Sequence, residues 1–522
     1  MGNQATETQL LNKELLGKGT PKSLDPAYQQ WLVINYSTAA ELEKMTQAVE
    51  LFDYQPTVSI ITPVYNTDAS FLEEAIQSVI AQIYPHWQLC LADDASTDSY
   101  VREILERYSD QDSRIQVIYR EQNGHISAAS NSALEIASGE FIALLDHDDL
   151  LAPDALYRVV ELLNQNPSAD MIYSDEDKVD ENYYLSNPFF KPDWCPDSFL
   201  SKMYTCHLGV YRHSVVKEIG GFREGYEGSQ DYDLVLRFSE KTSQILHLPK
   251  ILYHWRLHEN STALNRDAKP YTDMTSVKAL TEAILRRKEP GKVEVFKPGC
   301  FIPRYDIKKN SLVSIIIPSK DLADIVNNCL GSIFSKTNYP NYEIVLVDNG
   351  TTDPKALEVL SSWQNKEPER FKLRPYDVPF NYPKLNNYGV SQAAGEYLLF
   401  LNNDIEILSE NWLTAMVEQV QRSSIGAVGA RLLYPDNTIQ HAGVVIGIGG
   451  VAGHSHKHFP GEDMGYFRAI QTINNYLAVT GACLMCRRDV FDSVQGFEEE
   501  LSVAFNDVDF CLKIAELGYK NI

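Results

Sequence analysis

Apolar and polar segments alternate through most of the chain and predict strands and helices in turn. Between residues 58 and 146, four short apolar runs, each typical of a buried strand, are separated by segments with helical spacing. The first of these segments predicts a helix from about Phe71 to Gln82, with Ser70 and Glu73 spaced as a capping box. Continuous apolar strands that alternate with helices indicate an α/β fold with a mainly parallel sheet covered by helices.

The same order of elements occurs twice. "VSIITPVYN" begins at Val58 and "VSIIIPSKD" begins at Val313, 255 residues later, and the pair "LADDASTD" and "LVDNGTTD" keeps this offset. Further along, "SQDYDLVLRF" at Ser229 corresponds to "FNDVDFCLKI" at Phe505, 276 residues later. About 20 residues are therefore added within the second copy. A fixed offset held over several motifs predicts an internal repeat of a whole domain.

The repeat predicts two tandem domains, in agreement with a chain of 522 residues and a prior of about 150 residues per domain. We expect a helical N-terminal extension over residues 1–54 and a first domain over residues 55–262. A structured linker over residues 263–311 should then lead to a second domain over residues 312–522. The linker contains a helical pattern, "SVKALTEAILRRK", and a short strand pattern, "KVEVF".

Composition and charge narrow the possible partners and compartments. Hydrophobic residues make up 44% of the chain and charged residues 22%, which is typical of globular proteins, and the net charge of −25 disfavours nucleic acid as a partner. Among the eight cysteines, only Cys483 and Cys486 are close in sequence, and they fit buried reduced thiols better than a metal site. The N-terminus lacks a hydrophobic signal region, so we expect a cytoplasmic protein, with peripheral association on the inner face of a membrane left open.

Acidic and polar residues follow several predicted strands directly. "TPVYN" at 62–66, "DDAS" at 93–96 and "DHDD" at 146–149 each end an apolar run, and the carboxyl ends of parallel strands meet at one edge of a sheet. Two carboxylates about 4 Å apart repel by roughly 4 kcal/mol at an effective dielectric constant near 20. The first strand is not followed by a phosphate-binding glycine loop. A divalent cation, Mg²⁺ or Mn²⁺, held by these acids and bridging to substrate phosphates, satisfies both observations.

These motifs, taken in order, resemble those of the family 2 glycosyltransferases of the GT-A fold. The first copy matches in "SIITPVYN", "ADDASTD", "NGHISAASNSAL", "LLDHDD", "GGFREGYEGSQDYDL" and "LYHWRLHENST". The chain as a whole is similar to tandem-domain bacterial enzymes, often labelled rhamnosyltransferase-like, that build O-antigen and other surface polysaccharides. The resemblance implies two tandem nucleotide-diphospho-sugar transferase domains that transfer a sugar, with inversion, from a nucleoside-diphosphate sugar to a glycan or lipid-linked glycan acceptor.

The resemblance also implies roles for individual residues of the first copy. By position, the base pocket would be lined by Thr62, Tyr65 and Asp93, with Asp94 nearby. Asp146 would face the ribose or the metal ion, and Asp148 would bind the metal ion directly. Asp231 would be the catalytic base. A further metal ligand is expected from a histidine, and both His254 and His258 lie where the family can place one. Without the resemblance, a role in stabilising a helix N-terminus would be favoured for Asp231 over catalysis; with it, that role is left to Asp233.

The second copy keeps fewer of these residues. Asp348 remains as the expected base-pocket contact, Asp404 as the metal ligand and Asp507 as the catalytic base. In contrast, Tyr65 is replaced by Lys320 and Asp94 by Asn349. The chain ends shortly after Asp507, before the strand and the histidine-bearing loop that the resemblance implies, so a C-terminally truncated domain is expected. The added segment carries His441, His454, His456 and His458, for which a solvated or acceptor-facing loop is favoured over a zinc site.

Three functional interpretations remain open at this point. Both copies could be catalytic, with two donor sites. Alternatively, only the first copy is catalytic and the second is a degenerate glycan-binding or scaffolding module. A metal-dependent phosphohydrolase would also use clustered acids, but it would release inorganic phosphate instead of a nucleoside diphosphate.

Overall fold

A computed structural model describes residues 20–258 and 271–522. The chain divides into two compact units: unit 1 contains residues 1–195 and 202–287, and unit 2 contains residues 196–201 and 288–522. The first 19 residues of the predicted extension, and the predicted boundary at residues 262 and 263, lie outside the described residues. The predicted linker is divided between the units, because its helix belongs to unit 1 and its strand to unit 2.

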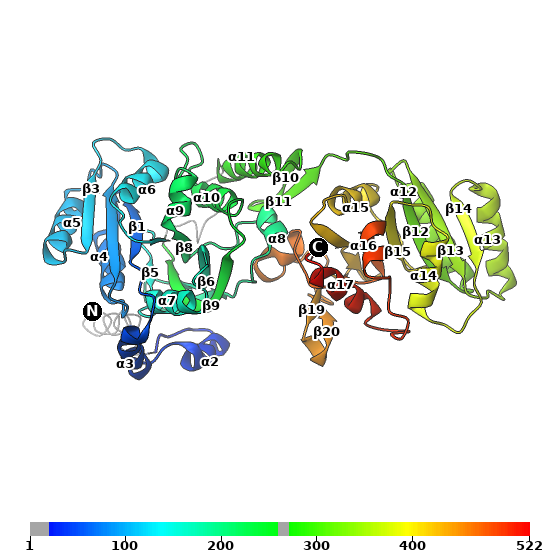
Figure 1. Cartoon of the computed structure of the whole chain (residues 1–522), viewed down its shortest axis with the longest axis horizontal. Helices are drawn as coiled ribbons and strands as arrows, with labels where there is room; N and C mark the ends of the chain where they lie inside the picture. Colours follow the sequence, from blue (N-terminus) through cyan, green and yellow to red (C-terminus); the bar gives the residue numbers. More distant parts are fainter. Residues whose placement is uncertain (1–19, 259–270) are drawn as a thin grey trace. The chain divides into compact units, whose positions relative to one another are not determined.

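The described residues of unit 1 form a nine-stranded mixed sheet (Figure 1). Its strands are β1 Val58–Val64, β2 Trp87–Asp93, β3 Ile115–Tyr119, β4 Phe141–Leu144, β5 Leu150–Leu151, β6 Met171–Val179, β7 Leu185–Phe189, β8 Gly209–Arg212 and β9 Ile245–Arg256. They lie in the order β3-β2-β1-β4-β8-β6-β9-β5, with β7 paired to β6. The first four in this order are mutually parallel, whereas β8 is antiparallel to both of its neighbours. The predicted parallel sheet is therefore present, and it is extended by an antiparallel insertion.

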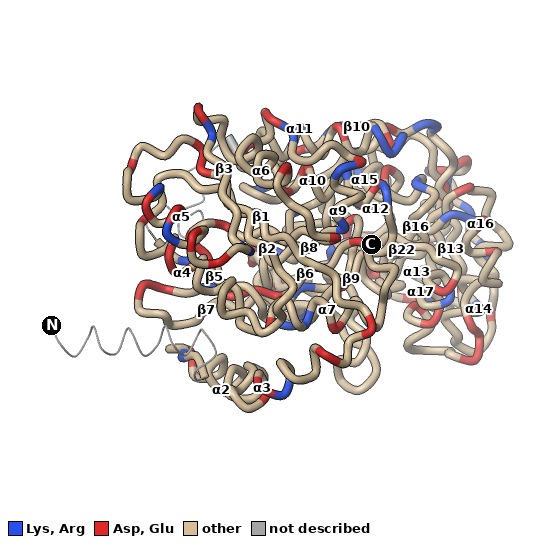
Figure 2. Tube along the Cα trace, turned by 60° about the vertical axis from the view of Figure 1, so that its left-hand side comes forward, with Lys and Arg blue, Asp and Glu red and all other residues tan. Residues whose placement is uncertain are grey.

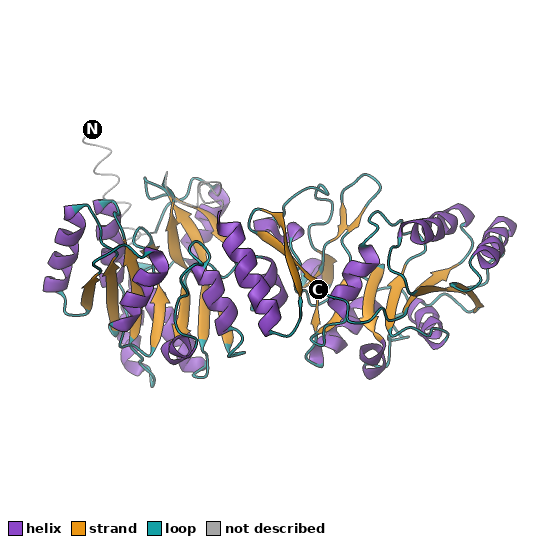
Figure 3. Cartoon of the chain, turned by 90° about the horizontal axis from the view of Figure 1, so that it is seen from above, coloured by secondary structure: helices purple, strands orange, loops and turns teal. Residues whose placement is uncertain are grey.

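Helices lie against both faces of this sheet (Figure 3). They are α4 Ala69–Ile80, α5 Ser99–Gln111, α6 His125–Glu135, α7 Ala155–Gln165, α9 His213–Glu218, α10 Gln230–Phe238 and α11 Tyr271–Arg286. The predicted capping box at the start of α4 is wrong: Asp68 is the N-cap and accepts a hydrogen bond from the Ser70 backbone N–H. A carboxylate directly before the helix can accept from the free N–H groups of its first turn, which leaves Ser70 inside the helix.

The N-terminal extension packs on the edge of unit 1. Its described residues contain α2 Pro26–Asn35, α3 Ala39–Ala48 and a 3₁₀ turn, Val49–Leu51. Tyr28, Leu32 and Tyr36 form one buried apolar cluster with residues of β5, β6, β7 and β9, including Ile251. Burying side chains of this size stabilises the contact by roughly 1.5–3 kcal/mol each.

Unit 2 repeats the sheet order of unit 1. Its main strands are β12 Val313–Ser319, β13 Tyr342–Asp348, β14 Phe371–Pro375, β15 Tyr397–Leu401, β16 Ile425–Gly429, β21 Cys483–Arg487 and β22 Lys520–Asn521, in the order β14-β13-β12-β15-β21-β16-β22. In β12, Ile315 and Ile317 belong to one buried cluster and Ile316 to another. Because successive side chains of a strand face opposite sides, this sheet is buried on both faces.

The remaining elements of unit 2 cover its sheet or lie in the added segment. The helices are α8 Pro196–Ser201, α12 Ala323–Lys336, α13 Pro354–Lys366, α14 Tyr382–Ser391, α15 Trp412–Val420, α16 Arg488–Ser493 and α17 Asn506–Glu516, with 3₁₀ turns at Ile448–Gly450 and Tyr466–Gln471. Two-stranded pairs are formed by β10 Gly291–Lys297 with β11 Cys300–Tyr305, β17 Leu432–Leu433 with β18 Ile439–His441, and β19 Val444–Ile446 with β20 Ala452–His454. The β19–β20 hairpin projects from the rest of unit 2 (Figure 1).

One general expectation, on the paired cysteines, can be compared with the structure. Cys483 and Cys486 are buried free thiols, as expected. Within the described ranges, no helix is both long and apolar enough to cross a bilayer. Acidic positions are distributed along the trace of both units (Figure 2).

Candidate functional site

The ends of β1 and β2 bring the first group of predicted residues together in unit 1. Thr62 and Asp93 lie on these paired strands, and both are almost completely buried. The Thr62 hydroxyl has no hydrogen-bond partner among the described residues, although its oxygen is buried. A buried hydroxyl without a partner costs free energy unless a ligand or a water molecule completes it. Asp93 accepts a hydrogen bond from the Ser96 N–H at 3.0 Å, which shapes the turn after β2.

Asp94 and Tyr65 differ in their surroundings. Asp94 is buried and accepts hydrogen bonds from Arg120 Nε at 2.7 Å and from the Gly124 N–H at 2.9 Å. The hydrogen bonds of this carboxylate are therefore made within the protein, and they hold the start of α6 against the end of β2. Tyr65 is 45% exposed, which leaves its ring free to stack on a ligand.

The three acids after β4 have three different environments. Asp146 has a half-exposed side chain, and the pair formed by Asp148 and His258 is about one-fifth exposed. Asp149 is buried and accepts hydrogen bonds from the Tyr253 hydroxyl at 2.6 Å and from the Arg256 N–H at 2.7 Å. Burial, with the Asp148 and Asp146 charges, raises the pKa of Asp149 well above its usual value. Asp149 thus fixes the loop, while Asp146 and Asp148 face solvent.

The two candidate histidines lie in different places. His258 Nε2 is 2.8 Å from Asp148 Oδ2. Burial alone would raise the pKa of Asp148, but the His258 hydrogen bond and the neighbouring His147 lower it to about 2. His254 is fully buried, with Nδ1 2.5 Å from Asp177 Oδ1, and Tyr28 donates to the other oxygen of this carboxylate. Of these two described histidines, His258 is therefore the one that pairs with an acid of the "DHDD" motif.

Asp231 is the second residue of α10, where it accepts a hydrogen bond from the Tyr232 N–H at 2.8 Å. Burial raises the pKa of Asp231; His207 lowers it, and the charge of Asp146 raises it further. Asp233, three residues into the same helix, is fully buried and pairs with Arg223 and Arg237. The two acids therefore differ: Asp233 is an ion-paired structural residue, and Asp231 is a half-buried carboxylate that faces the acid cluster.

Sequence reasoning missed a buried ionic group beside this cluster. Lys191 Nζ lies 3.0 Å from Glu176 Oε2 and also donates to the carbonyl oxygens of Ser174 and Thr205, each at 2.8 Å. Glu176 in turn accepts from the His207 N–H at 2.9 Å and lies 3.4 Å from His207 Nδ1. The acidic strand "SDEDKV" within β6 is the signal that could have revealed it, because acids inside a buried strand need partners.

His207 links this ionic group to the acids of the motif. Its Nε2 is 3.9 Å from Asp146 Oδ2, and its ring stacks on Tyr253 with the centroids 4.6 Å apart. Burial lowers the pKa of His207, but Glu176, Asp146 and Asp149 outweigh this effect and raise it to about 9. Part of the repulsion among the crowded acids of unit 1 is therefore offset by a protonated imidazole.

The donor set of unit 1 fits a divalent cation. Carboxylate oxygens suit Mg²⁺ and Mn²⁺, and imidazole is also a common ligand. Ligand atoms of Asp146, Asp149 and His207 lie within 4.8 Å of one another. Both Asp149 oxygens already accept hydrogen bonds, however. The more exposed Asp146 and Asp148, with His258, are thus the better available ligands.

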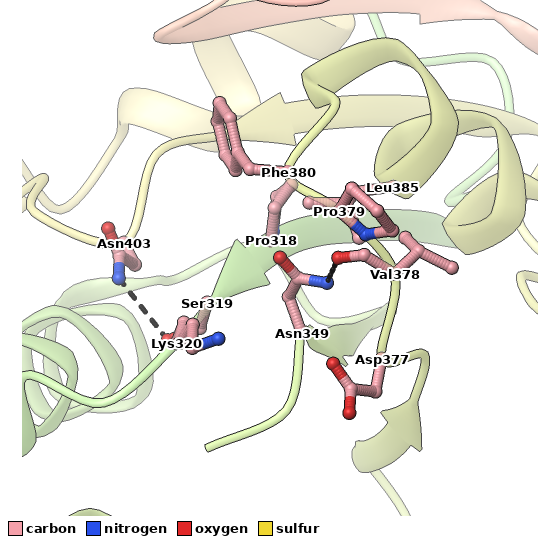
Figure 4. A pocket seen from close by; sticks show the side chains of 10 residues that line it. All are labelled: Pro318, Ser319, Lys320, Asn349, Asp377, Val378, Pro379, Phe380, Leu385 and Asn403. Atoms are coloured by element: carbon pink, nitrogen blue, oxygen red, sulfur yellow. Dashed lines mark hydrogen bonds between the residues drawn. The ribbon is translucent and has the colours of Figure 1, made fainter. Parts of the chain in front are cut away.

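A pocket of about 540 Å³ lies at the corresponding strand ends of unit 2 (Figure 4). It is lined by Pro318, Ser319, Lys320, Asn349, Asp377, Val378, Pro379, Phe380, Leu385 and Asn403. Asn349 replaces Asp94 and donates to the carbonyl oxygens of Tyr376 and Val378, so it closes the turn without an arginine. Asp348 accepts from the Thr351 N–H at 2.9 Å, as Asp93 does from Ser96.

The other predicted residues of unit 2 keep the backbone positions of their counterparts. Asp507 is the second residue of α17, as Asp231 is of α10, and accepts from the Val508 N–H at 2.9 Å. Asp404 follows β15 within "NND", where Asn403 donates to Ser319 Oγ at 3.2 Å. Among the described residues, no group of three metal-ligating side chains is found near Asp404.

The histidines of the added segment form a pair and two separate residues. His441 on β18 and His454 on β20 lie with their Nδ1 atoms 2.9 Å apart. His456 contacts the Ser455 hydroxyl, and His458 stacks on Tyr434. In the described part of the segment, no three of these side chains converge on one point as a zinc site requires.

A comparison of the sequence with protein families explains this doubled arrangement. The sequence model of "Glycosyl transferase family 2" matches residues 59–220 and again residues 314–494. The chain belongs to glycosyl transferase family 2. The double match, with the repeated sheet order, confirms the predicted fold class of two tandem GT-A domains.

Two similar relatives are longer than this chain. It is 46% identical to an uncharacterized protein of Sinorhizobium fredii, y4gI, over 92% of this chain and 53% of the relative. It is 37% identical to the O-antigen biosynthesis protein RfbC of Myxococcus xanthus, over 98% of this chain and 40% of the relative. The chain thus spans about half or less of the length of these two relatives.

Solved structures of similar proteins include a fragment of S. aureus TarS, residues 1–349, in complex with UDP-GlcNAc. It is 21% identical, covers 44% of this chain and 66% of its own, and has a TM-score of 0.37.

Proposed function

We propose that unit 1 is a metal-dependent inverting glycosyltransferase that moves a sugar from a nucleoside-diphosphate sugar to a hydroxyl of a glycan or lipid-linked glycan. Family membership supports the reaction class. The observation that carries the proposal for this chain is the group of charges after β4: His207 lies 3.9 Å from Asp146, and His258 lies 2.8 Å from Asp148 in the same loop. The charges of His207 and Asp146 also act on the pKa of Asp231. The name of the Myxococcus relative supports a place in surface-polysaccharide synthesis, either of O-antigen or of an exopolysaccharide.

The donor is expected to lie along the ends of β1, β2 and β4. Thr62 would donate its unpartnered hydroxyl to the nucleoside, Tyr65 would stack on the base, and Asp93 would accept from it. Asp94 would act indirectly, by holding Arg120 and α6 in place. Asp146 would contact the ribose or the ion, and Asp148 with His258 would hold a Mg²⁺ or Mn²⁺ ion; His254 is assigned to the support of Asp177. When bound, the ion would supply Lewis-acid stabilisation of the leaving diphosphate.

Asp231 is proposed to accept the proton of the acceptor hydroxyl. Its raised pKa makes it a stronger base than an exposed aspartate, and it faces the same cluster as Asp146. His207, held by Glu176 and Lys191, would keep positive charge next to the donor phosphates. Inversion follows if the acceptor hydroxyl attacks opposite the leaving diphosphate in one step.

The proposal is tested by nucleoside-diphosphate release from a panel of nucleotide sugars, using the full-length chain with Mg²⁺ or Mn²⁺. Asp231→Asn should lower the rate by roughly 10²–10⁴-fold, the usual contribution of a general base. Glu181→Gln, which changes an exposed acid of the same unit, is the matched control. Inorganic phosphate released from simple esters, without any nucleoside diphosphate, would instead indicate the phosphohydrolase.

Unit 2 has two candidate roles, and we favour a second transferase site. Asp348 and Asp507 keep the backbone contacts of Asp93 and Asp231, and the pocket of about 540 Å³ has room for a ligand. Asp404 would then be the sole carboxylate of its motif on the ion. A glycan-binding module remains the alternative, because Thr62 is replaced by the apolar Ile317 and Tyr65 by Lys320. Asp507→Asn should abolish one linkage and Asp231→Asn a different one; no effect of Asp507→Asn would support the binding module.

A further inference from the structure

The segment added to unit 2 contains a histidine pair that the proposed roles do not use. His441 is 1% exposed and His454 is partly buried, and they come from β18 and β20. The hydrogen bonds of this pair determine which nitrogen of each ring carries the proton.

His441 is held by two backbone donors. The Gly443 N–H points at His441 Nε2 from 3.3 Å, and the Thr480 N–H points at the same atom from 3.5 Å. An imidazole nitrogen that faces two N–H donors must be the unprotonated nitrogen. Gly443 has a φ of +102°, and a Cβ there would lie 2.2 Å from the Tyr476 ring, so this turn requires glycine.

The arrangement of His441 determines the tautomer of His454. With Nε2 as an acceptor, neutral His441 carries its hydrogen on Nδ1, which lies 2.9 Å from His454 Nδ1. His454 Nδ1 must then accept this hydrogen bond, so the hydrogen of the neutral His454 ring is on Nε2. Burial lowers the pKa of both histidines, in agreement with two neutral rings. His454 Nε2–H has no hydrogen-bond acceptor among the described residues and is available as a donor.

The pair adjoins the candidate base of unit 2. Thr480 N–H donates to His441, and the next backbone group, Gly481 N–H, donates to Asp507 Oδ2 at 2.8 Å. The charge of Asp507 also acts on His454. Adjacent amides of one peptide segment thus hold the histidine pair and the carboxylate next to each other.

Unit 1 has a histidine in the same neighbourhood, but it comes from a different element. In the sheet registers, Ile142 pairs with Tyr211 in unit 1, and Leu398 pairs with Cys486 in unit 2. Tyr211 and Cys486 are therefore equivalent positions, and the residues four positions before them in the sequence are His207 in unit 1 and Ala482 in unit 2. Unit 2 has therefore lost the histidine that faces Asp231, and the added segment supplies His454 beside Asp507.

We infer that His454, fixed by His441, donates its Nε2–H to an oxygen of a carbohydrate bound beside Asp507, and that the added segment is the acceptor-contacting wall of unit 2. The inference rests on the proposed function only for the role of Asp507. A neutral donor suits a sugar hydroxyl next to the carboxylate that accepts a proton, because the two groups hold opposite sides of one hydroxyl. His454 is thus a positioning residue for the acceptor.

The direct test uses the full-length chain labelled with ¹⁵N-histidine and methyl glycosides of common hexoses and 6-deoxyhexoses as probes. The NMR spectrum should show His454 as the Nε2–H tautomer, assigned by loss of its signal in His454→Asn. A glycoside titration should move that signal. The inference is overturned if His454 carries its hydrogen on Nδ1, or if no glycoside shifts it.

Kinetics provide the second readout. His454→Ala should raise the acceptor KM of the linkage that depends on Asp507 by roughly two- to tenfold, the value of one hydrogen bond, and leave the donor KM unchanged. His454→Gln, which keeps an N–H donor, should recover part of the loss, and His458→Ala on the same segment is the control. An unchanged acceptor KM in His454→Ala would contradict the inference while leaving the transferase proposal intact. If glycosides shift the His454 NMR signal but Asp507→Asn leaves the transferase activity unchanged, His454 contacts a bound carbohydrate and unit 2 is not catalytic.

Discussion

Replacing Lys191 with methionine should destabilise unit 1 by about 3–5 kcal/mol, the usual cost of removing one partner of a buried ion pair. The Lys191 side chain is 0% exposed and that of Glu176 is 6% exposed. Methionine approximates the length of the lysine stem but removes the ammonium group, so three carbonyl oxygens lose this donor and Glu176 is left with its contacts to His207. The effect should be large because water cannot reach the buried carboxylate to replace the lost contact.

Urea unfolding followed by hydrogen exchange of β6 and β8 peptides would measure unit 1 separately from unit 2. Lys241→Met is the matched control, since Lys241 pairs with Glu218 on the surface, where both side chains are about half exposed. A surface pair of this kind contributes at most about 1 kcal/mol. Equal losses in the two variants would refute the account of the buried pair.

The same pair predicts a pH dependence. Burial opposes ionisation of Glu176, but Lys191 and His207 lower its pKa to about 2. A carboxylate with a lowered pKa in the folded state contributes stability above its unfolded pKa of about 4.3, and this contribution is lost as the pH falls through the folded value. The stability difference between the wild type and Lys191→Met should therefore narrow as the pH falls from about 4.5 towards 2.

Three further substitutions test the separate roles of His254 and His258 and the buried arginine of unit 2. His258→Ala should weaken Mn²⁺ binding by about 10–100-fold, because it removes the group that lies 2.8 Å from Asp148. His254→Ala should leave Mn²⁺ affinity unchanged and lower the urea midpoint of unit 1, because Asp177 loses a buried partner. Calorimetric titration of both variants with Mn²⁺ tests this assignment, and equal effects on Mn²⁺ binding would contradict it. Arg422→Met should destabilise unit 2 by about 3 kcal/mol, since Arg422 lies 2.6 Å from Asp197 and 3.1 Å from Glu289 in a largely buried cluster. Faster hydrogen exchange of β16 would show this loss of stability, and protection equal to that of the wild type would contradict it.

The sequence was informative where the physical signal is local. Continuous apolar strands ending in acids predicted the parallel part of both sheets, and the 255-residue offset matched Asp348 to Asp93, with which it shares a turn contact in the structure. It was uninformative where partners are distant along the chain. The choice between His254 and His258 depends on which acid each ring meets, and those acids lie 77 and 110 residues away.

The buried ionic group of unit 1 was missed for the same reason. Lys191, Glu176 and His207 come from different strands and loops, and only the folded sheet brings them beside Asp146. Without that group, only a metal ion would offset the repulsion among the crowded acids of "DHDD". With it, the protein itself supplies one protonated imidazole, and the proposed ion would offset the charges of Asp146 and Asp148.

Calorimetric titration of the full-length chain with UDP and with GDP, each with and without Mn²⁺, tests the central claim that Asp148 holds an ion which binds the donor diphosphate. We expect Mn²⁺ to tighten binding of at least one nucleotide to the wild type, and we expect this gain to be lost at one site in Asp148→Asn. The control Asp180→Asn, which changes an acid outside the cluster, should keep the gain. Nucleotide binding that is the same with and without Mn²⁺, or a gain that survives fully in Asp148→Asn, would contradict the account.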